Sequence, residues 1–138
     1  MSFGREVTVS DDYVTAFYED YYRGKVGINE PEPHSTIHYD GSEASAYETT
    51  DTSYALGTID HTLFTEGEIT VTLPSASTFD GRIYYIRNTD QDASDDVTLD
   101  VTTGGGQIEL STSHTIENDT GVIVQSDGTN WWLISTYP

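Results

Sequence analysis

The acidic run from Asp90 to Asp96 is the part of the chain whose residue types and spacing best suit metal chemistry. Asp90, Asp92, Ser94 and Asp96 place side-chain oxygens at every second position, as at the start of a calcium-binding loop. Such a loop also needs a central glycine and a distant bidentate glutamate, and both are missing from this pattern. We therefore expect a solvated loop without a metal ion, and keep calcium binding by Asp90, Asp92 and Asp96 as the alternative.

The other candidates for chemistry lack the context that their reactions need. His34 and His38 are four residues apart, but Pro31 and Pro33 disfavour the helix that would turn both toward one zinc ion. The chain has no cysteine and no Gly-x-Ser-x-Gly nucleophile motif, and Gly104–Gly106 is not followed by the Lys-Ser/Thr pair of a phosphate loop. The sequence therefore predicts a protein that is not an enzyme and that carries no cofactor.

The chain carries 24 Asp and Glu against five Lys and Arg, which gives a formal net charge of −19. At about 1 M salt the Debye length is about 3 Å, so the repulsion that opposes compaction in dilute salt is screened. Ten Tyr, two Trp and four Phe argue against a disordered acidic tail. The composition therefore predicts a folded protein adapted to high salt. It argues against nucleic-acid binding and anionic membrane surfaces, and no apolar run approaches the roughly 18 residues needed for membrane insertion.

Residues 1–28 are expected to form an arm with a short helix. Ser10 is a suitable N-cap and Gly24 a suitable C-cap for a helix of about twelve residues. The spacing i, i+3, i+4 and i+7 places four apolar or aromatic side chains on one helical face. We expect this face to anchor the arm on another protein through Val14, Phe17, Tyr18 and Tyr21. The alternative is a carbohydrate-stacking surface made by Tyr13, Phe17, Tyr18, Tyr21 and Tyr22.

Residues 29–66 are expected to be a weakly patterned linker, because Asn29–Pro33 is a breaker cluster. Short strands are expected within it at Thr36–Tyr39 and Tyr54–Leu56. Residues 67–138 contain six short strands separated by turn residues, which predicts a mainly β domain with a compact antiparallel β-sandwich or β-prism-like fold. The positions expected in its core or in a seam between subunits are Ile69, Val71, Leu73, Ile83, Tyr85, Leu99, Val122, Val124, Trp131, Trp132 and Leu133.

Five elements of residues 67–138 occur in a characteristic order. They are an alternating strand that ends in VTLP and small residues, an I-x-N strand after a glycine, a VTL strand, a glycine-rich turn and an SDGTNW hairpin. In this order and spacing they resemble a small β-module of tail-fibre, baseplate and other surface proteins of tailed viruses. The elements are Thr70–Ala76, Gly81–Asn88, Val97–Leu99, Gly104–Ile108 and Ser126–Trp132.

The resemblance implies a homotrimer at a virion surface. In long fibres the module is one bead of a large chain, whereas here it makes up most of the sequence. This favours a short spike, a turret subunit or a capsid decoration protein, from a tailed virus of halophilic archaea. The expected partners are further copies of the chain and other virion proteins such as the major capsid protein. The alternative is a tail-fibre or baseplate receptor-binding protein that recognises a host-surface glycan.

Overall fold

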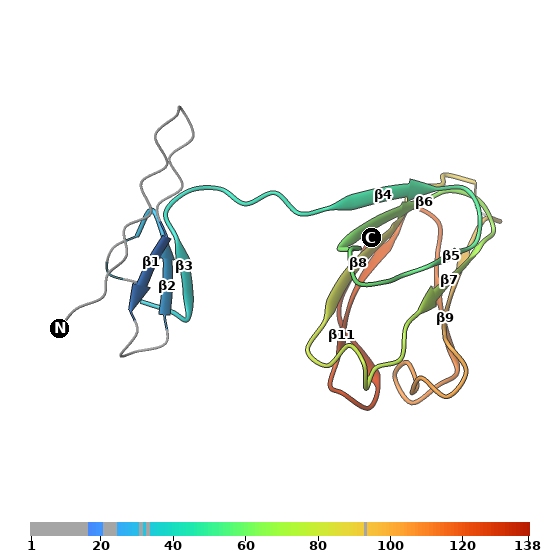
Figure 1. Cartoon of the computed structure of the whole chain (residues 1–138). Coiled ribbons are helices and arrows are strands. Elements are labelled where there is room, and N and C mark those ends of the chain that lie inside the picture. Colours follow the sequence, from blue (N-terminus) through green and yellow to red (C-terminus); the bar gives the residue numbers. More distant parts are fainter. Residues whose placement is uncertain (1–16, 21–24, 31, 33, 93) are drawn as a thin grey trace. The chain divides into compact units, whose positions relative to one another are not determined.

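The computed structural model describes residues 17–20, 25–30, 32, 34–92 and 94–138. The chain divides into two compact units, Met1–Ala44 and Ser45–Pro138, each with its own β-structure (Figure 1). Every helix or strand assigned in the described ranges is a β-strand, so the mainly β prediction is confirmed there. None of these residues forms a helix of the length and apolar character needed to cross a membrane.

The first unit contains a three-stranded sheet with the order β1-β2-β3. Its strands are β1 (Phe17–Asp20), β2 (Lys25–Ile28) and β3 (Ile37–Tyr39). β1 is antiparallel to β2, and β3 is parallel to it. The short strand predicted near Thr36–Tyr39 is thus confirmed.

The helix predicted across the N-terminal arm is wrong at Phe17–Asp20, which form a strand. Phe17 pairs with Ile28, and Asp20 with Lys25. Aromatic residues favour strands, and β2 follows closely enough to satisfy the backbone hydrogen bonds of β1. Of the predicted anchor residues, Phe17 and Tyr18 lie in β1, while Val14 and Tyr21 lie outside the described residues.

The second unit consists of two sheets. One has five strands in the order β12-β11-β8-β6-β4, and the other has four in the order β10-β9-β7-β5. The strands are β4 (Tyr47–Thr50), β5 (Tyr54–Ala55), β6 (Thr62–Thr65), β7 (Thr70–Leu73), β8 (Ile83–Asn88), β9 (Val97–Val101), β10 (Ser113–Ile116), β11 (Gly121–Ser126) and β12 (Trp131–Tyr137). Residues 45–66 therefore supply three strands of the unit, and the prediction of a linker is wrong there. The short strand predicted at Tyr54–Leu56 is found as β5.

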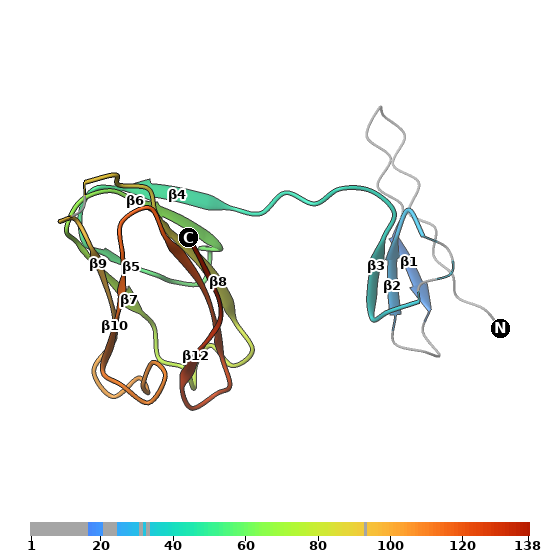
Figure 2. The same ribbon diagram turned by 180° about the vertical axis from the view of Figure 1, so that it is seen from behind.

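From β4 to β9 the chain passes alternately from one sheet to the other (Figures 1 and 2). Strands that are next but one in the sequence consequently run in the same direction, and the pairs β4–β6, β6–β8, β5–β7 and β7–β9 are all parallel. The last three strands close the unit with antiparallel pairs. The all-antiparallel prediction was wrong because turns such as the one after Pro74 cross between sheets and do not form hairpins.

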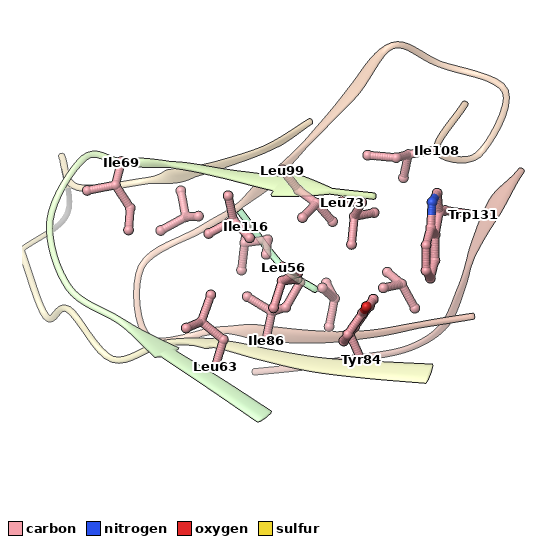
Figure 3. Close-up of a cluster of buried hydrophobic side chains, with 14 of the residues drawn as sticks. Leu56, Leu63, Ile69, Leu73, Tyr84, Ile86, Leu99, Ile108, Ile116 and Trp131 are labelled. Carbon is pink, nitrogen blue, oxygen red and sulfur yellow. The ribbon is translucent and has the colours of Figure 1, made fainter. Parts of the chain in front are cut away.

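The buried side chains of both sheets form one hydrophobic core (Figure 3). In β7, Val71 and Leu73 are buried, while Thr70 and Thr72 are only partly covered. In β8, the core is reached by Tyr84 and Ile86. Several predicted core positions are buried, namely Ile69, Val71, Leu73, Leu99, Val122, Val124 and Trp131.

Four predicted core positions are placed differently. Tyr85 is on the outer face of the five-stranded sheet and is exposed, so it does not lie in the core of the unit, and its alternative place in a seam between subunits stays a prediction. Ile83 shares that outer face and is half-buried. Trp132 and Leu133 are also half-buried, with Leu133 packed against the core. The strand β8 is apolar from Ile83 to Ile86, so its sequence could not reveal which alternate residues face inward.

We predict that Leu99→Ala destabilises the second unit by about 2–5 kcal/mol, because it removes a fully buried side chain and leaves a cavity. Thr98→Ala is the matched control, since Thr98 is the exposed neighbour on the same strand, and its cost should be below about 1 kcal/mol. Urea denaturation at one fixed high salt concentration measures both. Equal losses for the two variants would contradict the core assignment.

Candidate interaction surface

The hairpin between β11 and β12 is held by Asp127. One oxygen, Oδ1, accepts hydrogen bonds from the backbone N–H groups of Thr129 (2.8 Å) and Asn130 (2.7 Å), and Oδ2 accepts one from Trp132 Nε1 (2.7 Å). These hydrogen bonds lower the pKa of Asp127, with the bond from Asn130 as the largest cause and the bond from Trp132 as the next. Gly128 has a positive φ of 83°, which glycine adopts without strain. The SDGTNW element therefore builds a specific turn.

This hairpin is also tied to the segment that follows β7 in the other sheet. The Trp131 side chain is fully buried, and its Nε1 donates to the carbonyl oxygen of Pro74 at 3.0 Å. The hydroxyl of Ser126 donates to the carbonyl oxygen of Ala76 at 2.8 Å. Figure 3 shows Trp131 at one end of the core, beside Ile108. The VTLP and SDGTNW elements thus close the same end of the core.

The glycine-rich turn joins the same cluster of hydrogen bonds. The backbone N–H of Gln107 donates to Asn130 Oδ1 (3.0 Å), and the N–H of Trp131 donates to the carbonyl of Gln107 (2.8 Å). Gly106 has a φ of 105°, and a Cβ there would lie 2.3 Å from the carbonyl oxygen of Thr129. Only glycine allows this approach. Three of the five elements in the motif therefore meet at one place.

The I-x-N element has a similar role at Asn88, which is fully buried. Its Nδ2 donates to the carbonyl oxygens of Asp95 (2.8 Å) and Ile116 (3.4 Å), and its Oδ1 accepts from the N–H of Asp90 (3.1 Å). A buried amide with partners on both atoms fixes the path of the chain around it. Asn88 therefore anchors the acidic loop between β8 and β9 to the body of the unit.

The acidic loop brings together a different trio from the one predicted. Among the described residues, the carboxylates of Asp90, Asp92 and Asp95 lie within 4.8 Å of one another, whereas Asp96 accepts a hydrogen bond from the N–H of Asn118 (3.2 Å). Asp90 accepts from the N–H groups of Asp92 and Gly67, both at 2.8 Å, and these bonds lower its pKa. Both Asp90 oxygens are thus already used to shape the loop.

The histidine pair of the first unit also has local partners. The N–H of His34 donates to His38 Nδ1 at 3.3 Å, and that nitrogen lies 3.9 Å from Glu30 Oε2. The two rings are 5.7 Å apart between centroids. One nitrogen of His38 is therefore engaged with the backbone, which favours a role in shaping the turn before β3.

The outer side of the five-stranded sheet collects large apolar and aromatic side chains. The register pairs Tyr47 with Thr62, Thr62 with Tyr85 and Tyr85 with Ile123, so these four residues form one row across four strands. Their neighbours in sequence, such as Leu63 and Ile86, are buried in the core, so the row itself faces outward. We name this surface the aromatic face; its large side chains are Tyr47, Phe64, Ile83, Tyr85, Ile123, Trp132 and Tyr137.

Several rings of the aromatic face are exposed. Tyr47 is 71% exposed, Tyr137 46% and Tyr85 37%. The Tyr47 ring meets Phe64 edge-on, with centroids 6.2 Å apart and an interplanar angle of 69°. The Tyr85 ring stacks on His61, with centroids 4.9 Å apart. An exposed patch of large apolar side chains is typical of a site that another molecule covers.

Charge is distributed unevenly over the second unit. Residues 45–138 include 15 Asp and Glu, but none occupies an outward strand position of the five-stranded sheet. The one acidic residue in its strands, Glu48, pairs with the buried Leu63 and so belongs to the inner side of the edge strand. The charged residue of the face is Arg87, which donates to Asp119 Oδ1 at 2.5 Å and to the carbonyl oxygen of Pro138 at 3.2 Å.

The outer side of the four-stranded sheet is chemically different. Thr70, Thr98 and Thr115 form one row across it, and Thr72, Asp100 and Ser113 form the next. The side chains on this side are small and polar, as expected for a surface that faces solvent. The sequence did not reveal the aromatic face, because the register of β4, β6 and β8 was unknown.

Comparison of the chain with protein-family models, with curated proteins and with solved structures gives no match. A functional interpretation therefore rests on the residues themselves. The described part of the second unit offers two features that such an interpretation can use: the hydrogen-bonded end of the core, and the aromatic face, whose outward strand positions carry no acidic residue.

We predict that Asp127→Asn lowers the Tm at neutral pH, because the amide cannot accept from Trp132 Nε1 while keeping both backbone bonds. The lowered pKa means that this carboxylate stabilises the fold above the unfolded-state pKa of about 4, and that the contribution disappears as the pH falls through the lower folded-state pKa. The difference from the wild type should therefore shrink in acid. Thermal unfolding at several pH values and constant salt measures it.

The matched control is Asp51→Asn, which removes one exposed carboxylate from the turn after β4 and changes the net charge equally. If both variants melt alike at every pH, the hydrogen bonds of Asp127 do not stabilise the hairpin.

Proposed function

We propose that this protein is a virion structural protein, a capsid decoration or turret subunit that assembles as a homotrimer on the particle of a halophilic tailed virus. In this proposal the second unit is a β-sandwich or β-prism-like surface module. The observation that carries it is the convergence of the VTLP, glycine-rich and SDGTNW elements on one end of the core. The hydrogen bonds of these elements stabilise the fold, which is the role expected of the characteristic elements of a structural module.

The division of the chain into two units supports a division of roles. In the proposed arrangement the first unit attaches the protein to another virion protein, such as the major capsid protein, and the second unit faces the medium. The proposed anchor residues remain Val14, Phe17, Tyr18 and Tyr21, now in a segment that contains β1. The covalent connection runs through residues 40–46, which enter the second unit at β4.

The acidity fits exposure to brine. Salt strengthens apolar association and screens charge repulsion, so a neutral particle surface would aggregate at high salt. Carboxylates concentrated in the loops of the second unit keep its exterior hydrated. The proposed function needs no chemistry from these groups, which agrees with the structural hydrogen bonds made by Asp90 and Asp127.

Exposed tyrosines on the outer side of the five-stranded sheet are also the observation that favours the second candidate function, a tail-fibre or baseplate protein that binds a host-surface glycan. Electron microscopy of virus particles with a labelled antibody against the protein separates the two. Label over the head supports the decoration or turret role, and label confined to the tail overturns it.

We predict that the assembled protein dissociates when salt falls below about 0.2 M, where the Debye length is about 7 Å and the negative charges of neighbouring copies repel. Sedimentation velocity across a salt series measures the mass, and circular dichroism at the same points checks that the β-structure is retained. A trimer that is unchanged in dilute buffer would contradict the role assigned to screening.

We predict that a fragment of residues 45–138 folds but does not join particles, because it contains the whole two-sheet core and lacks the proposed anchor. Particles stripped of the protein are mixed with the fragment or with the full chain, and bound protein is quantified after sedimentation. Binding of the fragment equal to that of the full chain would overturn the anchor assignment.

A further inference from the structure

We propose that the aromatic face is the surface through which copies of this chain pack against one another. This inference rests on the proposed self-assembly and identifies the surface responsible. The face belongs to β4, β6, β8, β11 and β12, and its centre is Tyr85 on the middle strand. The occupant is the same face of the other copies of the chain, gathered around the threefold axis of the proposed homotrimer.

The first argument is the cost of leaving this surface in water. Tyr47, Tyr85 and Tyr137 are exposed, and Phe64 and Trp132 are only half-buried within the unit. Covering apolar surface is favourable, and concentrated salt strengthens the effect. A face of this kind in brine drives association unless something covers it.

The second argument is charge. Two copies of a chain with a net charge of −19 can approach closely only through a surface that does not bring carboxylates together. No outward strand position of the five-stranded sheet carries a carboxylate, whereas the other sheet carries Asp100 on its outer side. The two loop carboxylates that reach the aromatic face, Asp119 and Asp127, are hydrogen-bonded to Arg87 and Trp132 of the same chain. Arg87 is paired with Asp119 of the same chain, so its charge is locally balanced.

The ring geometry favours a protein partner over a sugar. A glycan platform presents open ring faces to the sugar. Here Tyr47 and Phe64 are tilted 69° to each other, and one face of Tyr85 is already covered by His61. The aliphatic side chains Ile83 and Ile123 lie on the same face. Tilted rings mixed with aliphatic groups suit interdigitation with another packed surface.

The test uses the full chain at about 1 M salt or above, where repulsion between copies is screened. Tyr85→Glu and Tyr47→Glu each introduce one carboxylate on the aromatic face. Thr98→Glu is the matched control, because Thr98 is an exposed outward residue on the other sheet. Sedimentation velocity over a dilution series gives the association constant, and circular dichroism and the Tm confirm that each variant is folded.

We expect both tyrosine variants to associate at least about tenfold more weakly than the wild type, because a carboxylate would be buried against an identical one. Thr98→Glu should associate like the wild type. Tyr47 lies on an edge strand outside the core cluster, so the association constant of Tyr47→Glu alone decides the test if Tyr85→Glu fails to fold.

Unchanged association of the folded tyrosine variants, or equal weakening by Thr98→Glu, would overturn the assignment of this face while leaving self-assembly intact. A wild-type chain that is monomeric at every concentration in brine would instead remove the proposed self-assembly and this inference together. Loss of binding to immobilised glycan in the tyrosine variants, with the oligomer retained, would assign the face to the sugar and overturn the inference.

Discussion

The burial of one side of each sheet against the other is the interaction on which the second unit depends. The chain crosses between the sheets after each strand from β4 to β8, so the strands of the two sheets are interleaved along the sequence. Alternate residues such as Val71 and Leu73 fill the shared interior, and the residues between them are left to determine the two outer surfaces. The same alternation that builds the core therefore also creates one polar exterior and one aromatic exterior.

The two ends of this core are closed by polar groups. At one end Trp131 and Ser126 bind carbonyls of the segment after β7, and at the other Asn88 holds the acidic loop. The contacts of Trp131 and Ser126 join segments about 50 residues apart in the chain. The VTLP and SDGTNW elements thus each supply one side of these long-range hydrogen bonds.

Strict alternation, as in Thr70–Leu73, and the Asp127-Gly128 turn were sufficient to predict strands and one hairpin correctly. Three results needed the structure. The inward side of β8 could not be inferred because four successive residues are apolar. The direction of neighbouring strands depends on which turns cross between sheets, and local turn chemistry does not encode this. The N-terminal arm has apolar residues at helical spacing, but Phe17–Asp20 pair with β2 as a strand. The periodicity of a sequence does not show whether a partner strand is available. The aromatic face was hidden for the same reasons.

The place where the chain enters the second unit has a mechanical consequence. Residues 40–46 lead into β4, an edge strand that pairs with β6 alone and contributes no residue to the hydrophobic core of the described unit. Tension transmitted from the first unit would therefore peel β4 away before the core was disturbed. Detachment of β4 from β6 would lengthen the connection between the units under shear. The pairing would form again when the force is released.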